Sequence, residues 1–122
     1  MLRQVAQHVE DMDRAVAFYR DVVGLTLIAR FDAASLAFFD LGNTRLLLEA
    51  GAPSSILYLG VDDVAASTEE LRRAGVVIES EPHTIYVDEE GRFGSPGEAE
   101  EMSFFRDSEG NLVGLAGRVS AA

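Results

Sequence analysis

Apolar residues recur at helical spacing near the start of the chain, in residues 7–25, QHVEDMDRAVAFYRDVVGL. Side chains three or four positions apart share one face of a helix, so this segment predicts an amphipathic helix between two strands. Asp11 stands where a side chain caps the first helical turn, and Gly24 stands where the helix ends. The residues expected on the apolar face are Met12, Ala15, Val16, Tyr19, Val22 and Val23.

The same pattern returns in residues 59–77, LGVDDVAASTEELRRAGVV. A shift of 52 positions aligns Val9 with Val61 and Asp11 with Asp63, so the two expected capping residues coincide. The chain therefore contains an internal repeat, in which each copy is one supersecondary unit. The cap, the apolar face and the end expected for the second helix are Asp63, Val64, Thr68, Leu71 and Gly75.

A pair of strands follows each predicted helix. Residues 36–50, LAFFDLGNTRLLLEA, are typical of a hairpin with a tight turn at Gly42 and Asn43. Residues 102–117, MSFFRDSEGNLVGLAG, are the counterpart, with a turn at 109–111. Neither half has enough sheet to cover its own helix, so the halves are expected to pack together or to pair with another chain.

Each half reads as a strand, a helix and then two or three strands, which predicts a single α+β domain over residues 1–122. Its first module spans about residues 1–52 and its second about residues 53–122. The irregular segment 82–100, PHTIYVDEEGRFGSPGEAE, is longer than the roughly 12–15 residues common for a connection without regular structure. It is either a lid over a site or disordered, and its interruptions by His83, Ile85, Tyr86 and Phe93 favour a lid.

Charge and composition limit the classes of partner. Ten Lys and Arg against 21 Asp and Glu give a net charge of −11, which repels nucleic acids and anionic membranes and favours a cationic or neutral ligand. The chain has no cysteine, so disulfides, thiolate metal sites and cysteine nucleophiles are excluded. No run approaches the roughly 20 apolar residues that cross a bilayer. We therefore expect a cytoplasmic protein with no nucleic-acid or membrane partner.

Three segments together carry a resemblance to a known superfamily: VEDMDRAVAFYRDVVGL, VDDVAASTEELRRAGV and FFRDSEGNLVGL. They resemble the vicinal oxygen chelate superfamily, which includes glyoxalase I, extradiol dioxygenases, methylmalonyl-CoA epimerase, fosfomycin-modifying enzymes and bleomycin-resistance proteins. The resemblance covers nearly the whole chain. It implies two βαβββ modules that form a curled mixed sheet around a cavity, commonly in a homodimer.

The resemblance also implies a divalent metal, held by one inward-facing His, Gln or Glu side chain from each of four strands. It places one ligand on Gln4 and another on Glu49. The corresponding positions of the second half are Ile56 and Gly114, whose side chains cannot bind a metal. The leading expectation is therefore no tightly held metal, and the alternative is a divalent ion on the two remaining donors and a histidine.

Strand alternation predicts the same cavity-facing positions independently. In LRQVAQHV, Val5 and Val9 share one face of the strand. If these valines cover the helix, the opposite face of the strand lines the cavity. The residues expected to face the cavity on three strands are Gln4, Ala6, His8, Arg45, Leu47, Glu49, Ile56, Tyr58 and Gly60.

Glu49 and His8 are the candidate catalytic residues. A carboxylate beside apolar side chains has its charged form disfavoured, which suits Glu49 to act as a general base or a metal ligand. The alternatives are that Glu49 pairs with Arg45 or lies in solvent at the end of its strand. His8 could bind substrate or exchange protons near neutral pH, or it could be a hydrogen-bonded structural residue.

The remaining candidates bind substrate or complete a metal site. If the predicted lid folds over the cavity, His83 joins Gln4 and Glu49 as a third donor; otherwise His83 is a surface residue. Tyr58 and Gln4 could orient a ligand by hydrogen bonds, beside the apolar Ile56, whereas the alternative for Tyr58 is packing in the core.

Three functions follow from these expectations. The first is a glyoxalase/bleomycin-resistance-type protein that binds a small organic molecule in the cavity between the modules, without a tightly held metal; the net charge favours a cationic ligand. The second is a lyase, isomerase or dioxygenase, in which a divalent ion on Gln4, Glu49 and either His8 or His83 polarises a substrate oxygen. The third is an interaction module whose pocket has closed.

Overall fold

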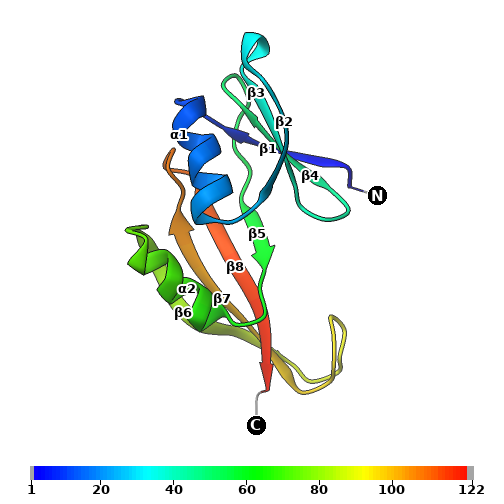
Figure 1. Ribbon diagram of the computed structural model, residues 1–122. Coiled ribbons are helices and arrows are strands. Elements are labelled where there is room, and N and C mark those ends of the chain that lie inside the picture. The colour runs from blue at the N-terminus through cyan, green and yellow to red at the C-terminus, as the bar shows by residue number, and fades with distance from the viewer. Residues whose placement is uncertain (1, 121–122) are drawn as a thin grey trace. The chain divides into compact units, whose positions relative to one another are not determined.

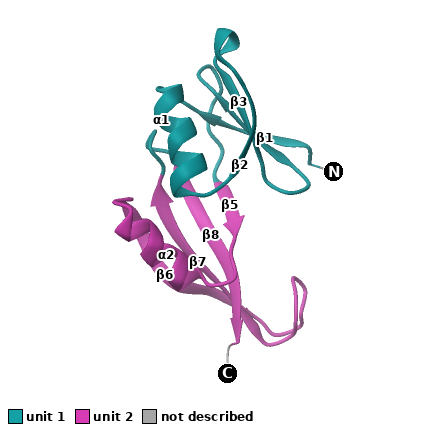
Figure 2. Ribbon diagram, in the orientation of Figure 1, with its two compact units in different colours: residues 1–56, 107–111 teal, residues 57–106, 112–122 magenta. Residues whose placement is uncertain are grey.

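The computed structural model describes residues 2–120. This part of the chain divides into two compact units (Figure 2). The first contains the residues up to Ile56 together with residues 107–111, and the second contains residues 57–106 and those from Leu112 onward. Each unit holds one four-stranded sheet, and neither sheet closes into a barrel.

The first sheet contains the four strands of the first half, joined in the order β1-β4-β3-β2 (Figure 1). β1 is parallel to β4, and the other two pairs are antiparallel, so the sheet is mixed as predicted. A short 3₁₀ turn, η2 (Asp32–Ala34), connects β2 to β3. The strands are β1 (Gln4–His8), β2 (Thr26–Phe31), β3 (Leu36–Asp40) and β4 (Arg45–Glu49).

The predicted first helix is present, but its second half is wider than an α-helix. It begins as α1 (Met12–Ala17) and continues as a π-helical turn, η1 (Phe18–Val22), where the amide of Val23 donates to the carbonyl of Phe18. The Asp11 side chain caps the first turn by accepting a 3.1 Å hydrogen bond from the amide of Arg14. The spacing of apolar residues does not distinguish the two kinds of turn, because Ala15, Val16 and Tyr19 are buried on one face in either case.

The turn at residues 107–111 belongs to the first unit, although it joins two strands of the second. Its Asn111 side chain donates to the carbonyl of His8 at 2.9 Å. The Glu109 carboxylate accepts from the amides of Glu10 and Asp11 at 2.9 and 2.8 Å. The segment DSEGN, which contributes to the resemblance, is thus a structural element of the first unit as well as a hairpin turn.

The second sheet has the order β5-β8-β7-β6 (Figure 1). β5 is parallel to β8, and the remaining pairs are antiparallel, so the arrangement of the first sheet is repeated. This confirms the predicted pair of related α+β modules. The elements of this half are β5 (Leu57–Gly60), α2 (Val64–Arg73), β6 (Ile78–Asp88), β7 (Glu98–Arg106) and β8 (Leu112–Ser120).

The second helix follows the prediction from cap to end. Asp63 accepts a 2.9 Å hydrogen bond from the amide of Ala66, and Gly75 adopts φ +86° just after the helix. Val64, Thr68 and Leu71 are buried. The Thr68 hydroxyl lies 2.7 Å from that of Ser103 on β7, so α2 packs against the face of the second sheet that carries Ser103.

The expectation of a long irregular loop over residues 82–100 is wrong. β6 continues to Asp88 and β7 begins at Glu98, which leaves a connection of residues 89–97 between two paired strands. Register shifts interrupt the pairing at three places between Ile78 and Tyr86. Bulges of this kind break the alternation of polar and apolar residues, so the strand pattern is not visible in the sequence. In residues 2–120, no helix is long and apolar enough to cross a membrane.

Candidate functional site

A pocket of about 540 Å³ lies within the second unit, over all four strands of its sheet. Ser103 of β7 is directed toward α2, so its neighbour Met102 projects from the opposite face of the sheet. The same alternation directs Leu57 of β5 into the core and leaves Tyr58 on the open face. The pocket is therefore built on the face that α2 does not cover.

Small residues form the floor of this pocket. Gly60 is paired with Ala116 on β8, and Ala116 is paired with Met102 on β7, so this row of the sheet carries no side chain at Gly60, a methyl group at Ala116 and a flexible side chain at Met102. The rims are apolar or aromatic and include Ile85 and Phe93. A low floor with aromatic rims is a shape that accepts a flat organic molecule.

Gly114 occupies the centre of the neighbouring row of the sheet. It is paired with Tyr58 on one side and with Phe104 on the other. The two rings pack edge to face, with their centres 5.9 Å apart. A Cβ atom at position 114 would lie 3.0 Å from a carbon of each ring. The space of the missing side chain is thus occupied by the two aromatic rings.

Arg118 organises the polar end of the pocket. Its guanidinium group pairs with Asp88 at 2.8 Å, with Glu98 at 2.9 Å and with Glu100 at 3.3 Å. It also donates to the carbonyl of Ser95, in the connection between β6 and β7. These hydrogen bonds and charges raise the pKa of Arg118 further above its usual value, so the group is permanently charged.

Asp88 also holds the connection between β6 and β7. Its side chain is 2% exposed and accepts hydrogen bonds from the amides of Arg92 and Phe93 at 2.9 and 3.0 Å. Burial alone raises the pKa of Asp88, but these two amides and Arg118 outweigh it, and the pKa is lowered. The ionised carboxylate therefore holds residues 89–97 against the end of the sheet.

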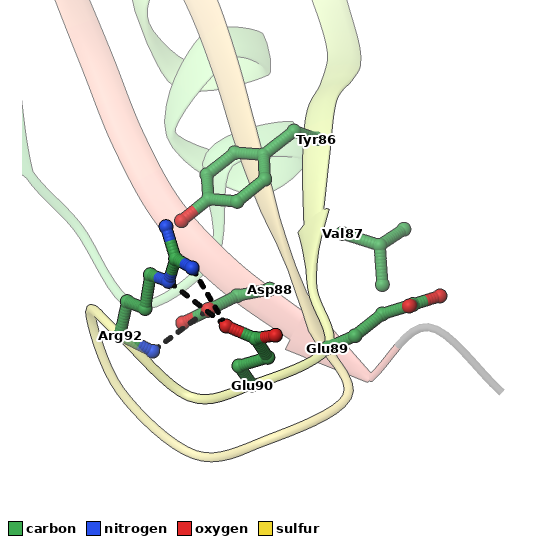
Figure 3. A pocket seen from close by; sticks show the side chains of 6 residues that line it. All are labelled: Tyr86, Val87, Asp88, Glu89, Glu90 and Arg92. Atoms are coloured by element: carbon green, nitrogen blue, oxygen red, sulfur yellow. Dashed lines mark hydrogen bonds and ion pairs between the residues drawn. The ribbon is translucent and has the colours of Figure 1, made fainter.

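A smaller pocket of about 250 Å³ lies beside this connection (Figure 3). Arg92 pairs with Glu90 at 2.8 Å, and Tyr86 projects on the same side as Arg92, whereas Val87 projects from the other side of the strand. Tyr86 also lines the larger pocket, where its ring meets that of Phe93 edge to face at 5.9 Å.

Three of the predicted site residues lie on neighbouring strands of the first unit. β1 and β4 are paired in parallel so that His8 is in register with Glu49 and Gln4 with Arg45. The Gln4 side-chain oxygen accepts a 2.7 Å hydrogen bond from Nε of Arg45, whose guanidinium carbon lies 5.5 Å from the ring centre of Phe38. His8 and Glu49 are both half-buried.

The predicted site residues of the second half lie on or beside its sheet. Tyr58 is 55% exposed and lines the pocket, so the alternative of core packing is wrong. Ile56 is 49% exposed just before β5. His83 is on β6 in register with Met102, and its Nδ1 lies 2.8 Å from the carbonyl of Glu81, so it is a strand residue and does not belong to a lid.

Within residues 2–120, no group of three or more His, Asp or Glu side chains is arranged to hold a metal. The proposed donors are divided between the units, with Gln4 and Glu49 in the first and His83 in the second. The three-donor set therefore stays a prediction.

Sequence reasoning missed the residues that shape the charged end of the pocket, above all Glu100 and Arg118. Glu100 was assigned to the irregular segment, and Arg118 lies beyond the segments that carry the resemblance. The register of β7 and β8 pairs these two residues directly. The signal that could have found them is the continuation of the predicted second hairpin by one or two further pairs on each strand.

Comparison with known proteins identifies the family. The family model described as the Glyoxalase/Bleomycin resistance protein/Dioxygenase superfamily matches residues 2–115. No curated protein matches the chain in sequence.

Solved structures share the fold at low sequence identity. TnmS3, an antibiotic binding protein from Streptomyces sp. CB03234, is 22% identical with a TM-score of 0.77, over 98% of this chain and 96% of that one. Lactoylglutathione lyase from Agrobacterium tumefaciens is 22% identical with a TM-score of 0.74, over 96% and 92%. A superfamily member from Sphaerobacter thermophilus is 17% identical with a TM-score of 0.74, over 96% of both chains.

Proposed function

Because the chain belongs to the glyoxalase/bleomycin resistance protein/dioxygenase superfamily, we propose that it binds a small organic molecule in the pocket on the second sheet, without a resident metal in that half. The observation that carries the proposal is the pocket of about 540 Å³, with small residues below, aromatic rims and one charged end. Apolar surfaces with a few convergent polar groups are characteristic of small-molecule sites.

The second half of the chain does not fit a metal site. The side chains of Ile56 and Gly114 offer no donor atom, and the rings of Tyr58 and Phe104 occupy the space into which a side chain at position 114 would project. A divalent ion needs convergent oxygen or nitrogen donors. The proposed binding function therefore requires no metal on this sheet.

The similarity to TnmS3 agrees with a binding role. That protein is described as an antibiotic binding protein and shares 22% of its sequence with this chain. Identity at this level establishes the fold, whereas the nature of the ligand must come from the residues in the pocket. The proposal accordingly rests on the lining of the pocket.

A second candidate function is a metal-dependent lyase, isomerase or dioxygenase. The observation that favours it is the pairing of β1 with β4, which sets His8 beside Glu49 and keeps Gln4 on the same pair of strands. In that case a divalent ion held with Gln4 and Glu49 would polarise a substrate oxygen, and His8 would exchange a proton. Metal analysis of chelator-free protein distinguishes the candidates, because a stoichiometric ion lost in Glu49→Ala would favour the enzyme.

Blocking the pocket tests the leading proposal directly. Ala116→Trp would fill the floor, whereas Ala65→Trp, at an exposed position of α2, adds the same side chain away from it. Chemical shifts of backbone amides would be followed while a set of aromatic fragments is added. We expect shifts at residues 58–60, 100–102 and 116–118 in the wild type and in Ala65→Trp, and their loss in Ala116→Trp. Equal responses in all three proteins would refute the pocket as the binding site.

A further inference from the structure

We propose that this pocket selects an organic cation and that Glu100 is the residue that recognises its positive charge. The inference rests on the proposed binding function, and it adds the charge class of the ligand and the specificity-determining residue. The open face of the second sheet provides the apolar contacts. The acidic end, at Glu100, distinguishes a cationic molecule from neutral and anionic molecules of the same shape.

The positive charge in this pocket is already neutralised. Arg118 pairs with three carboxylates, those of Asp88, Glu98 and Glu100, and donates to the carbonyl of Ser95. Three carboxylates against one guanidinium group leave a local formal charge of −2. A carboxylate or phosphate on a ligand would therefore meet repulsion at this end, although an arginine lies there.

The backbone of the β6–β7 connection also covers the guanidinium group. A Cβ atom built on Gly94 would lie 2.6 Å from Nε of Arg118, so the chain at this position passes directly against the group. The carbonyl of Ser95, in the same connection, also accepts a hydrogen bond from Nη2 of Arg118. An anionic ligand could reach Arg118 only by displacing this connection.

Glu100 is the least tightly held of the three carboxylates. Its contact with Arg118 is 3.3 Å, compared with 2.8 Å for Asp88 and 2.9 Å for Glu98. Among residues 2–120, Nη1 of Arg118 is the donor that reaches the Glu100 side chain. That side chain is 20% exposed and lines the pocket, so a carboxylate oxygen is available to a second cation.

Aromatic residues of the same pocket support the same charge, and one of them, Tyr86, is in register with Glu100 on the neighbouring strand. Tyr58, Tyr86 and Phe93 line the pocket, and the faces of aromatic rings attract cations. An ammonium group at Glu100 would combine a charge-assisted hydrogen bond with attraction to the ring of the paired Tyr86, whereas a neutral hydroxyl group would gain only part of this interaction. The pocket thus favours a flat apolar molecule with one basic amine.

Three anthracene derivatives of nearly equal size test the inference: 9-aminomethylanthracene, which is cationic, 9-hydroxymethylanthracene, which is neutral, and anthracene-9-carboxylate, which is anionic. Affinities would be measured by fluorescence anisotropy. We expect the cation to bind about tenfold or more tightly than the neutral probe, and the anion to bind most weakly. Glu100→Gln should weaken the cation about tenfold or more and leave the neutral probe within about twofold.

Two further variants separate recognition from general effects. Glu70→Gln removes the same charge from an exposed position of α2 and should leave all three affinities unchanged. Glu100→Asp keeps the charge and should keep the preference for the cation, which excludes misfolding as the cause. Equal binding of the cationic and neutral probes, or equal losses in Glu70→Gln and Glu100→Gln, would overturn the inference alone. Binding of none of the probes to the wild type would overturn the proposed function together with it.

Discussion

The hydroxyl of Tyr19 donates a 2.6 Å hydrogen bond to the carboxylate of Asp107, and the two residues are 88 positions apart in the chain. Tyr19 is fully buried, and Asp107 is 6% exposed. Burial, the charge of Asp107 and this hydrogen bond raise the pKa of Tyr19 well above its usual value, so the hydroxyl keeps its proton and remains a donor. The contact fixes the turn at residues 107–111 to the helix of the first unit.

Removal of the Tyr19 hydroxyl should destabilise the protein strongly. Tyr19→Phe keeps the packing of the ring with Phe18 and Phe39 but leaves the buried Asp107 without this donor. The expected loss is about 1.5–3 kcal/mol in the free energy of unfolding. Urea denaturation would measure it, with Tyr58→Phe as the control at an exposed ring. A Tyr19→Phe midpoint equal to that of Tyr58→Phe would show that the hydrogen bond contributes nothing.

Glu109 should make the stability of the first unit depend on pH in the acidic range. Burial raises the pKa of this carboxyl group, but hydrogen bonds from Arg14 and from the amides of Asp11 and Glu10 outweigh it and lower the pKa to about 2. The folded pKa is below the unfolded value of 4.5, so the stabilisation is present above pH 4.5 and is lost as the pH falls toward 2.

The variant Glu109→Gln isolates this contribution. We expect the unfolding midpoint of the wild type to fall more steeply between pH 5 and about pH 2.5 than that of Glu109→Gln, because the variant has no proton to take up at this position. Glu70→Gln, on the surface of α2, should keep the steep dependence of the wild type. Parallel curves for the wild type and Glu109→Gln would contradict the role of this carboxylate.

Arg118 should control the opening of the β6–β7 connection. Arg118→Gln removes the charge that faces Asp88, Glu98 and Glu100, so three carboxylates would repel one another across the end of the sheet. We expect the amides of Arg92 and Phe93, which donate to Asp88, to exchange with solvent on the order of tenfold faster. Arg92→Gln, which loses a pair with the exposed Glu90, is the matched control. Unchanged protection in Arg118→Gln would mean that Asp88 holds the connection without the arginine.

Any side chain at position 114 should lower the stability of the protein. In Gly114→Ala the added carbon would lie 3.0 Å from Tyr58 and Phe104, so the two rings must separate. We expect a loss of about 1–3 kcal/mol, measured by thermal or urea unfolding. Gly51→Ala is the control, since a Cβ atom there meets nothing within 4 Å. The double variant Gly114→Ala/Phe104→Leu should recover part of the loss, and failure to do so would show that the crowding has another source.

The parts of the fold that depend on local pattern were predictable. The caps Asp11 and Asp63 are found where the sequence indicates them, because a capping side chain acts on an amide three residues away. The hairpin with its turn at Gly42 is likewise local. The length of β6 was not predictable, because its bulges disturb the alternation on which a strand prediction depends.

The candidate site divides in the same way. Alternation along one strand predicted that Tyr58 faces a cavity between the modules, which stays a prediction; the structure shows that Tyr58 is exposed and lines a pocket within the second unit. Glu100 and Arg118 come together only through the register of β7 with β8, which extends beyond the predicted hairpin. The roles assigned to Gln4, His8, Glu49 and His83 depend on contacts over longer distances, and they stay predictions.

The placement of residues 107–111 in the first unit has a consequence for synthesis of the chain. Tyr19 is synthesised first, and the carboxylate that Tyr19 binds follows 88 residues later. During synthesis, the N-terminal half therefore lacks the hydrogen bond between Tyr19 and Asp107 until residue 107 has been added. A fragment that ends at Ile56 would lack residues 107–111, so the first unit can complete its buried contacts only after most of the second repeat has been synthesised.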